Sequence, residues 1–320
     1  MSNSNNSLDE IRKKIDNAEN IVIIGHTNPD GDAVGSCTGL AYILKEINKK
    51  VTVLLENYAK RYDCVSGRDL VISEFDENLK FDLAISLDCG DRERMGKAVS
   101  IFENCYNINI DHHISNVFFG NMNFVNPEAS STSELVYELA KGFVSLNKNS
   151  AACLYMGILS DTGGFRHTNT SPYTMQIISE LMQYQFDFSR IYNNIFNTHT
   201  LKEAKFMGKA LDKLKLYNQN KVAISYLTLE EISEFNGSSN DLGSIVEYLK
   251  NIENIDVAVF LYSKGKDEIK VSMRSESNIN VSEICTSFGG GGHKKAAGCT
   301  LFTNMNEALN IIINTLNKYF

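Results

Sequence analysis

The sequence predicts an α/β protein of two domains, in which a parallel-sheet domain is followed by a smaller α/β domain. Short apolar runs alternate with stretches of helical spacing in the first part of the chain, which is typical of a parallel sheet covered by helices. The length of 320 residues is long for one hydrophobic core and comfortable for two. A charged stretch of helical spacing separates the two patterns. We therefore expect a first domain at 1–199, a linker helix at 200–216 and a second domain at 217–320.

The elements of the first domain follow from local patterns. Ser7-Leu8-Asp9-Glu10 resembles a capping box that opens a helix running to about Ala18. Short apolar runs, typical of strands buried on both faces, predict strands at 21–25, 51–55, 83–87 and 106–110. Apolar residues at helical spacing predict a helix over 33–47. From 131 to about 196 the pattern is mainly helical, and we expect a break at 157–166.

The second domain has its own strand pattern. Apolar runs predict strands at 222–227, 257–262 and 269–273, with helices between and after them. Gly289–Gly292 predicts a tight backbone turn. Because this domain mixes strands and helices, we expect a second, smaller α/β unit.

Charge and composition exclude several classes of function. The formal net charge is -8, whereas proteins that bind long duplexes carry a basic surface, so we expect no long duplex DNA as a partner. The seven cysteines form no C-x-x-C pair, which disfavours disulfides and a zinc knuckle and favours a reducing cytoplasm. No apolar run approaches the ~20 residues that span a bilayer, so we expect no membrane partner. The oligomeric state stays open, with a homodimer as one option.

Aspartate and histidine residues recur at the predicted strand ends. They lie in four short segments: His26–Asp32, Asp88, Asp111–His113 and Asp161. Each segment alone has a plainer explanation, such as a solvated turn or a helix cap. In parallel sheets, however, ligands gather at the carboxyl ends of the strands, so the recurrence predicts one shared site.

The ligand types of this predicted site indicate its chemistry. Two divalent metals can share an activated water and neutralise phosphoryl oxygens, which suits hydrolysis of a phosphate ester at neutral pH. Mn²⁺ accepts mixed oxygen and imidazole ligands, whereas Mg²⁺ prefers oxygen. We therefore expect two divalent metal ions, in the first place Mn²⁺, with Mg²⁺ or Co²⁺ as alternatives.

The ordered motifs resemble the DHH phosphoesterase superfamily. The matching blocks are His26-Thr-Asn-Pro-Asp-Gly-Asp-Ala33, Leu87-Asp88, Asp111-His-His113 and Gly157-Ile-Leu-Ser-Asp-Thr-Gly-Gly-Phe-Arg166. Ser272-Met-Arg-Ser275 and Phe288-Gly-Gly-Gly-Gly-His293 resemble the DHHA1 domain of its RecJ-like branch. In length and domain content the chain is most similar to the NrnA-type nanoRNases, which degrade very short oligoribonucleotides and remove the 3′-phosphate of 3′-phosphoadenosine 5′-phosphate (pAp).

The resemblance implies roles for the residues of the first domain. It implies that one metal is held by His26 and Asp30, the second by Asp32, His112 and Asp161, and both by Asp88. It places Asp111 behind a ligand imidazole, which Asp111 orients. His113 is similar to the family histidine that faces the scissile phosphate, where it stabilises charge or protonates the leaving oxygen.

Substrate-binding candidates lie mainly in the second domain. The planar fork of Arg274 suits a phosphate, although a surface ion pair with a neighbour such as Glu276 is the plainer alternative. The backbone N–H groups of Gly290, Gly291 and Gly292 with His293 can cradle an anion. With the metals on the first domain, these residues predict an active-site cleft between the domains.

Two further segments of the first domain are open to more than one interpretation. Arg166 either reaches this cleft or has a core or capping role. The hydroxyls of Ser130–Ser133 most simply cap a helix, whose start can alternatively hold a phosphate.

The predicted function is a Mn²⁺-dependent phosphoesterase acting on short oligoribonucleotides and pAp. A phosphodiesterase for linear dinucleotides such as pApA is a close alternative that the sequence scarcely separates. A family II inorganic pyrophosphatase is disfavoured, because Ser-Phe-Gly-Gly-Gly-Gly-His stands where a basic Ser-Arg-Lys type of motif is expected. A non-catalytic nucleotide-binding protein would lack a ligand, yet every matched ligand position is filled.

Overall fold

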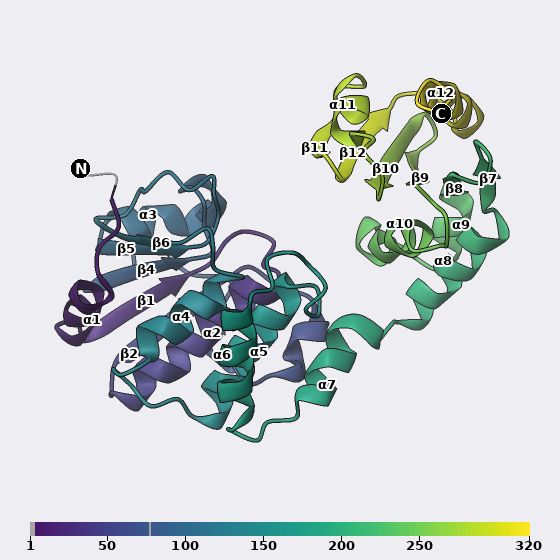
Figure 1. Cartoon of the computed structure of the whole chain (residues 1–320). Coiled ribbons are helices and arrows are strands. Elements are labelled where there is room, and N and C mark those ends of the chain that lie inside the picture. Colours follow the sequence, from purple (N-terminus) through teal and green to yellow (C-terminus); the bar gives the residue numbers. More distant parts are fainter. Residues whose placement is uncertain (1–3, 77) are drawn as a thin grey trace. The chain divides into compact units, whose positions relative to one another are not determined.

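The computed structural model describes residues 4–76 and 78–320, which form two compact units that divide between Thr198 and His199 (Figure 1). Each unit has its own sheet and its own hydrophobic core. The segment expected as a linker helix contains helix α8 (Leu201–Asp212) and strand β7 (Lys215–Tyr217). Phe206 and Ala210 of α8 are buried in the core of the second unit. The apolar face of this charged helix thus makes it a part of that unit.

The first unit is built on a six-stranded parallel sheet, which confirms the predicted α/β class. Its strands, in the order β3-β2-β1-β4-β5-β6, are β1 (Asn20–Ile24), β2 (Lys50–Leu54), β3 (Val71–Ile72), β4 (Leu83–Leu87), β5 (Tyr106–Asp111) and β6 (Met122–Val125). The short edge strands β3 and β6 were not predicted, because their few residues carry too little apolar pattern. All carboxyl ends lie along one edge of the sheet, since every pair is parallel.

Helices surround this sheet (Figure 1). They are α1 (Leu8–Asp16), α2 (Gly31–Glu46), α3 (Val99–Glu103), α4 (Thr132–Ala140), α5 (Lys148–Asp161), α6 (Pro172–Met182) and α7 (Phe188–Tyr192). Short 3-10 turns cover Lys60–Cys64, Arg68–Leu70 and Glu93–Ala98, and a π turn covers Asn193–Asn197. The capping box of Ser7 and Glu10 at the start of α1 forms as predicted. In the described part of the chain, no helix has both the length and the apolar character needed to cross a membrane.

The expected break at 157–166 is wrong in its first half, because α5 continues to Asp161. Gly157 lies where α5 packs on α2, opposite Gly35. A Cβ atom on Gly35 would lie 2.7 Å from the Gly157 nitrogen and 2.6 Å from the Cys153 carbonyl oxygen. Glycine therefore serves close helix packing here, a role that a sequence pattern cannot distinguish from a chain break.

The second unit has a mixed six-stranded sheet in the order β11-β12-β10-β9-β8-β7. Its further strands are β8 (Val222–Leu227), β9 (Val257–Gly265), β10 (Glu268–Ser275), β11 (Gly291–His293) and β12 (Ala296–Leu301). Its further helices are α9 (Leu229–Glu234), α10 (Gly243–Lys250), α11 (Val281–Thr286) and α12 (Met305–Leu316), with a 3-10 turn at Ser239–Asp241. The three predicted strands correspond to β8, β9 and β10. Only part of Gly289–Gly292 is a turn, because Gly291 and Gly292 belong to β11, which pairs with β12.

Candidate active site

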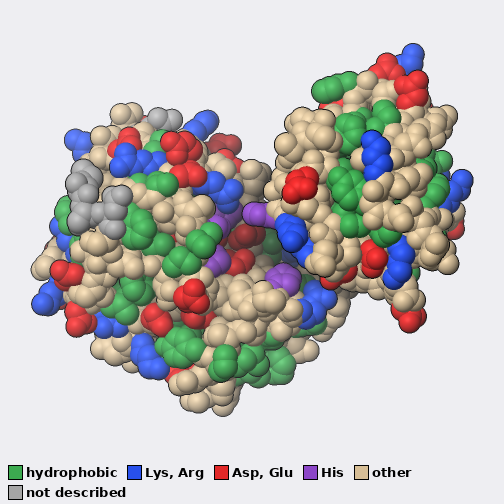
Figure 2. Space-filling view, turned by 45° about the horizontal axis from the view of Figure 1, so that its top comes forward, with side chains coloured by type: hydrophobic (Ala, Val, Ile, Leu, Met, Phe, Trp, Pro, Cys, Tyr) green, Lys and Arg blue, Asp and Glu red, His purple; other side chains and the backbone are tan. Residues whose placement is uncertain are grey.

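The carboxyl ends of β1, β4 and β5 bring the aspartates and histidines of the motifs together. Helix α2 begins and helix α5 ends beside them, at Asp30 and Asp161. In Figure 2, histidine and acidic side chains lie near one another on the surface of the first unit. Among the described residues, three groups have ligand atoms that all lie within 4.8 Å of one another: His26 with Asp30 and Asp88, Asp32 with His112 and Asp161, and Asp88 with His112 and His113.

His26 is held with one ring nitrogen toward the other ligands. Its Nδ1 lies 2.8 Å from the Thr27 carbonyl oxygen, which fixes this nitrogen as the N–H donor. Its Nε2 lies 3.4 Å from Asp88 Oδ2 and 3.8 Å from Asp30 Oδ1. Burial lowers the pKa of His26, but the Asp30 and Asp88 carboxylates outweigh it and raise the pKa to about 10. Without metal, the His26 imidazole is therefore protonated at neutral pH, because the carboxylates of Asp30 and Asp88 attract positive charge.

Asp88 is the central carboxylate of the site. It follows β4 in a left-handed conformation, with φ of 61°, which non-glycine residues adopt at a cost and often at functional sites. Its Oδ2 faces His26, whereas its Oδ1 lies 3.6 Å from His112 Nε2 and accepts a hydrogen bond from the Thr132 hydroxyl at 3.0 Å. Two oxygens directed at different histidines are what a bridging ligand requires.

Asp32 is fixed by the start of helix α4. The backbone N–H groups of Thr132 and Ser133 donate to its two oxygens at 2.6 and 2.9 Å. These N–H groups are therefore engaged, and the start of α4 holds a carboxylate where a phosphate was one alternative. Thr132 belongs to the segment expected to cap a helix or hold a phosphate, but its contacts were not predicted, since only the fold reveals that its N–H and its hydroxyl meet two different aspartates.

Crowded carboxylates characterise the second ligand group. Burial, followed by the charges of Asp88 and Asp161, raises the pKa of Asp32 well above its usual range. Burial likewise raises the pKa of Asp161 to about 6, with contributions from Asp88 and Asp30 that His112 opposes. His112 Nε2 lies 3.5 Å from Asp161 Oδ2. A site with several buried carboxylates favours a bound cation, because a cation compensates their repulsion.

Asp111 orients His113. Its Oδ1 lies 2.7 Å from His113 Nδ1, and its Oδ2 accepts a hydrogen bond of 2.7 Å from the Asn116 amide. The imidazole that Asp111 orients is thus His113, which was expected to face the scissile phosphate, and not one of the two histidines expected as metal ligands. The hydrogen bond from Asp111 is the main cause that raises the pKa of His113 to about 8. Asn116 was also missed, because its position in a loop gives no sequence signal.

The candidate substrate-binding residues have local partners. Arg166 donates from Nε to the Gly163 carbonyl at 2.8 Å, and its guanidinium lies 5.9 Å from the ring centre of Phe196. Arg274 forms an ion pair with Glu247 of α10. Arg274 is thus in an ion pair, as in the plainer alternative, but its partner is a different residue from the one expected. Glu276, the neighbour expected to pair with it, contacts Lys250 instead at 3.0 Å.

The glycine-rich turn departs from its predicted role in part. The N–H of Gly290 donates to the Cys285 carbonyl at 2.9 Å and so ends helix α11, which leaves it no free donor for an anion. A Cβ atom on Gly290 would lie 2.2 Å from the Gly298 carbonyl oxygen, whereas Gly291 has open space beside it. His293 is exposed at the end of β11.

Comparison with known proteins identifies the family. Residues 20–158 match the model described as DHH family, N-terminal domain, and residues 219–320 match the DHHA1 domain. A solved structure from Bacteroides fragilis, described as an exopolyphosphatase-related protein, is 31% identical, covers 98% of this chain and 96% of that chain, and has a TM-score of 0.88. The chain belongs to the DHH family. This confirms the resemblance inferred from the motifs.

Curated relatives of this DHH protein carry a more specific name. A Streptococcus mutans protein named "Probable bifunctional oligoribonuclease and PAP phosphatase NrnA" is 28% identical over 294 residues, which cover 92% of this chain and 93% of the relative. A Bacillus subtilis protein named "Bifunctional oligoribonuclease and PAP phosphatase NrnA" is 28% identical over 300 residues, with the same coverage. The likeness therefore extends across both units.

The donor set of this DHH protein fits divalent metal ions. Each of the three groups combines carboxylate oxygens with imidazole nitrogens, which are donor types that divalent metal ions accept. The fixed Nδ1–H of His26 leaves Nε2 as the ligand atom, the usual arrangement when the second ring nitrogen bonds to a carbonyl. The hydroxyl oxygen of Ser133 is buried beside the site without a hydrogen-bond partner in the described residues.

Proposed function

We propose that the protein is a Mn²⁺-dependent phosphoesterase that hydrolyses short oligoribonucleotides to mononucleotides and removes the 3′-phosphate of pAp. The observation that carries this proposal is the pair of ligand groups placed around the two oxygens of Asp88. The names of the curated relatives support the substrate class. The net charge of -8 favours short substrates over long duplexes. Seven free cysteines fit a reducing cytoplasm.

The residues of the candidate site would have separate roles. His26, Asp30 and Asp88 would hold one metal, and Asp32, His112 and Asp161 with Asp88 the other. When bound, the two metals supply an activated water and neutralise charge on the phosphoryl oxygens.

His113, held by Asp111, keeps a proton near neutral pH and can donate it to the leaving oxygen. Thr132 keeps Asp32 and Asp88 in place through its N–H and its hydroxyl.

The second unit would hold the rest of the substrate. Arg274 already faces a carboxylate, that of Glu247, so its guanidinium is positioned for an anionic partner. A substrate phosphate would have to share this guanidinium with Glu247 or replace the carboxylate. We therefore propose Arg274 and the exposed Gly291–His293 strand as substrate-binding residues, with His293 adding a donor.

A substrate comparison tests the proposal. Purified protein with Mn²⁺, Mg²⁺ or Co²⁺ is assayed on RNAs of two to five residues, pAp, pApA and pyrophosphate. We expect turnover of the shortest RNAs and of pAp, and none after chelation. Preference for pApA would favour the dinucleotide alternative, and preference for pyrophosphate over every nucleotide would contradict the proposal. Nucleotide binding without turnover under any metal would favour the non-catalytic alternative.

A further inference from the structure

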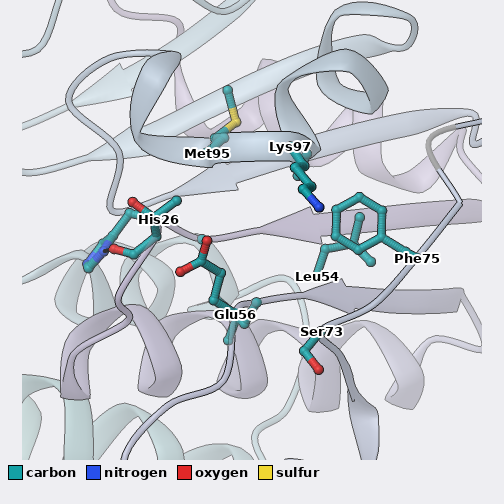
Figure 3. Close-up of a pocket in the computed structure, with 11 residues that line it drawn as sticks. His26, Leu54, Glu56, Ser73, Phe75, Met95 and Lys97 are labelled. Carbon is teal, nitrogen blue, oxygen red and sulfur yellow. Dashed lines mark hydrogen bonds between the residues drawn. The ribbon is translucent and has the colours of Figure 1, made fainter.

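A cavity of about 140 Å³ opens beside His26 at the carboxyl ends of β1 and β2 in the first unit. Figure 3 shows the Glu56 carboxylate directed into it, with His26 on one side and Phe75 and Lys97 on the other. Its residues come from 25–27, 54–56, 73–75 and 95–98, so the cavity lies wholly within one unit. None of these residues except His26 belongs to the metal groups described above.

The walls of the cavity combine apolar surface with few polar groups, as small-molecule sites do. Leu54, Phe75 and Met95 supply the apolar surface, and Glu56 and Lys97 are the charged groups of the rim. Drug-sized ligands occupy roughly 300 Å³ or more. A cavity of about 140 Å³ is therefore matched to one planar ring system and not to a whole nucleotide.

Glu56 connects the cavity to the metal-binding loop. Its Oε2 accepts a hydrogen bond of 3.1 Å from the N–H of Asn28, which lies between His26 and Asp30 and has φ of 53°. Within the described residues, no hydrogen bond or ion pair occupies Oε1 of Glu56 or the ammonium group of Lys97. One acceptor and one donor are thus free at the rim of an apolar cavity.

We propose that this cavity is a base-binding subsite that takes the nucleobase attached to the phosphate at the metal groups, and that it prefers guanine. The proposal rests on the proposed function, because it assumes a nucleotide whose phosphate lies near His26. Phe75 provides the aromatic surface on which the base stacks, as in other single-strand sites. Glu56 and Lys97 form hydrogen bonds with the edge of the base.

Guanine fits the charges of the rim better than the other bases. Its Watson–Crick edge presents two adjacent N–H donors, which the free Glu56 Oε1 and the remaining lone pair of Oε2 can accept, and an O6 acceptor, which an ammonium group binds. Adenine presents one amino group on that edge and no carbonyl oxygen. Because a buried polar group left without its partner is costly, the mismatch disfavours adenine.

Three variants test the subsite: Phe75→Ala, Glu56→Gln and Lys97→Met. Matched controls are Leu79→Ala and Lys80→Met, which change similar side chains of the first unit outside the cavity. Binding of guanosine and adenosine 5′-monophosphate is measured by calorimetry. Hydrolysis of GpG and ApA is measured beside a small generic phosphodiester that has no base.

The expected results differ by variant. Phe75→Ala should weaken guanosine monophosphate binding and lower kcat/KM on both dinucleotides by about 5- to 150-fold, the cost of removing an aromatic platform. Glu56→Gln should lower binding of guanosine monophosphate about 10-fold or more and that of adenosine monophosphate about twofold at most, because an amide offers only one acceptor. Lys97→Met should likewise affect guanine more. The generic phosphodiester and the controls should stay unchanged.

The measurement of nucleotide binding distinguishes a failure of this inference from a failure of the proposed function. Loss of nucleotide binding in Phe75→Ala supports the subsite even if no dinucleotide is hydrolysed, an outcome that would overturn only the proposed function. Hydrolysis of dinucleotides with unchanged kinetics in all three variants would overturn the subsite alone. Absence of guanosine monophosphate binding to the wild type, or an equal loss on the generic phosphodiester, would also overturn the subsite.

Discussion

Asp88 belongs to two of the three ligand groups found among the described residues. Its two oxygens face His26 and His112, and its backbone is held in the left-handed region. Asp88 directly follows β4. A change at Asp88 should therefore act on both metals at once.

Asp88→Asn should reduce turnover by at least about 100-fold, because substitutions even behind a metal ligand cost 10- to 100-fold. The shape of the side chain is kept, so the protein should stay folded with one carboxylate fewer. Metal stoichiometry by elemental analysis, activity and the melting temperature are measured together. Full activity with two metals bound would show that Asp88 is no ligand.

The pKa of His26 leads to a prediction about pH and metal binding. Without metal, Asp30 and Asp88 keep the pKa of His26 at about 10, despite the opposing effect of burial. A metal ligand must be deprotonated, so binding at neutral pH displaces a proton, and the apparent metal affinity should rise as pH increases toward 10. Calorimetry of Mn²⁺ binding in buffers of different ionisation heat measures the released protons. Affinity independent of pH would show that His26 does not bind the metal.

His113 and Asp111 make a second titration testable. Their hydrogen bond is the main cause of a His113 pKa of about 8, above the usual 6.5. Asp111→Asn should lower this pKa, and if His113 supplies a proton, the loss of activity at alkaline pH should shift to lower pH. NMR titration of the His113 ring and the pH profile of kcat measure both effects. An unchanged profile beside a lowered pKa would exclude His113 as the acid.

At the scale of elements, helices α2, α4 and α5 meet around glycine. A Cβ atom on Gly157 would lie 1.9 Å from the Ser133 hydroxyl oxygen and 2.8 Å from Asp32 Oδ1. Gly157→Ala should therefore destabilise the protein by about 1–3 kcal/mol and lower activity, since the added Cβ displaces Asp32 and also Ser133, whose backbone N–H donates to Asp32. Gly208→Ala in α8 is the matched control, because nothing lies within 4 Å and alanine favours a helix, so stability should rise by about 0.4–1 kcal/mol. Chemical denaturation measures both.

At the scale of elements, some features of the fold can be predicted from the sequence and others cannot. Short apolar runs located β1, β2, β4 and β5, and the motifs at their ends located the residues of the candidate site. The strand β3 could not be predicted, because its two residues are too few to show an alternating apolar pattern. The helical part of the Gly157 motif could not be predicted either, because a glycine at a contact between helices has the same sequence pattern as a glycine in a chain break. Thr132 and the Glu247 partner of Arg274 depend on contacts between distant segments, which periodicity does not encode.

At the scale of the whole molecule, the two units contain different candidate residues. All three metal groups lie in the first unit, whereas Arg274 lies on β10 of the second. Glu247 lies on α10 of the same unit, and it holds Arg274 through Nε. Metal binding and substrate binding should therefore respond separately to substitutions in the two units.

Arg274→Ala should weaken dinucleotide binding by roughly 1.5–3 kcal/mol, or about one to two decades, and leave Mn²⁺ affinity unchanged. Arg274→Lys should rescue only part of this loss, because an ammonium group cannot form the paired hydrogen bonds of a guanidinium. Glu247→Gln serves as the partner control: it removes the competing carboxylate charge, so substrate binding should be equal or tighter. Steady-state kinetics on a dinucleotide and on a small generic phosphodiester separate the two effects. If Arg274→Ala lowers activity on both substrates equally, Arg274 stabilises the fold through Glu247 and does not bind substrate.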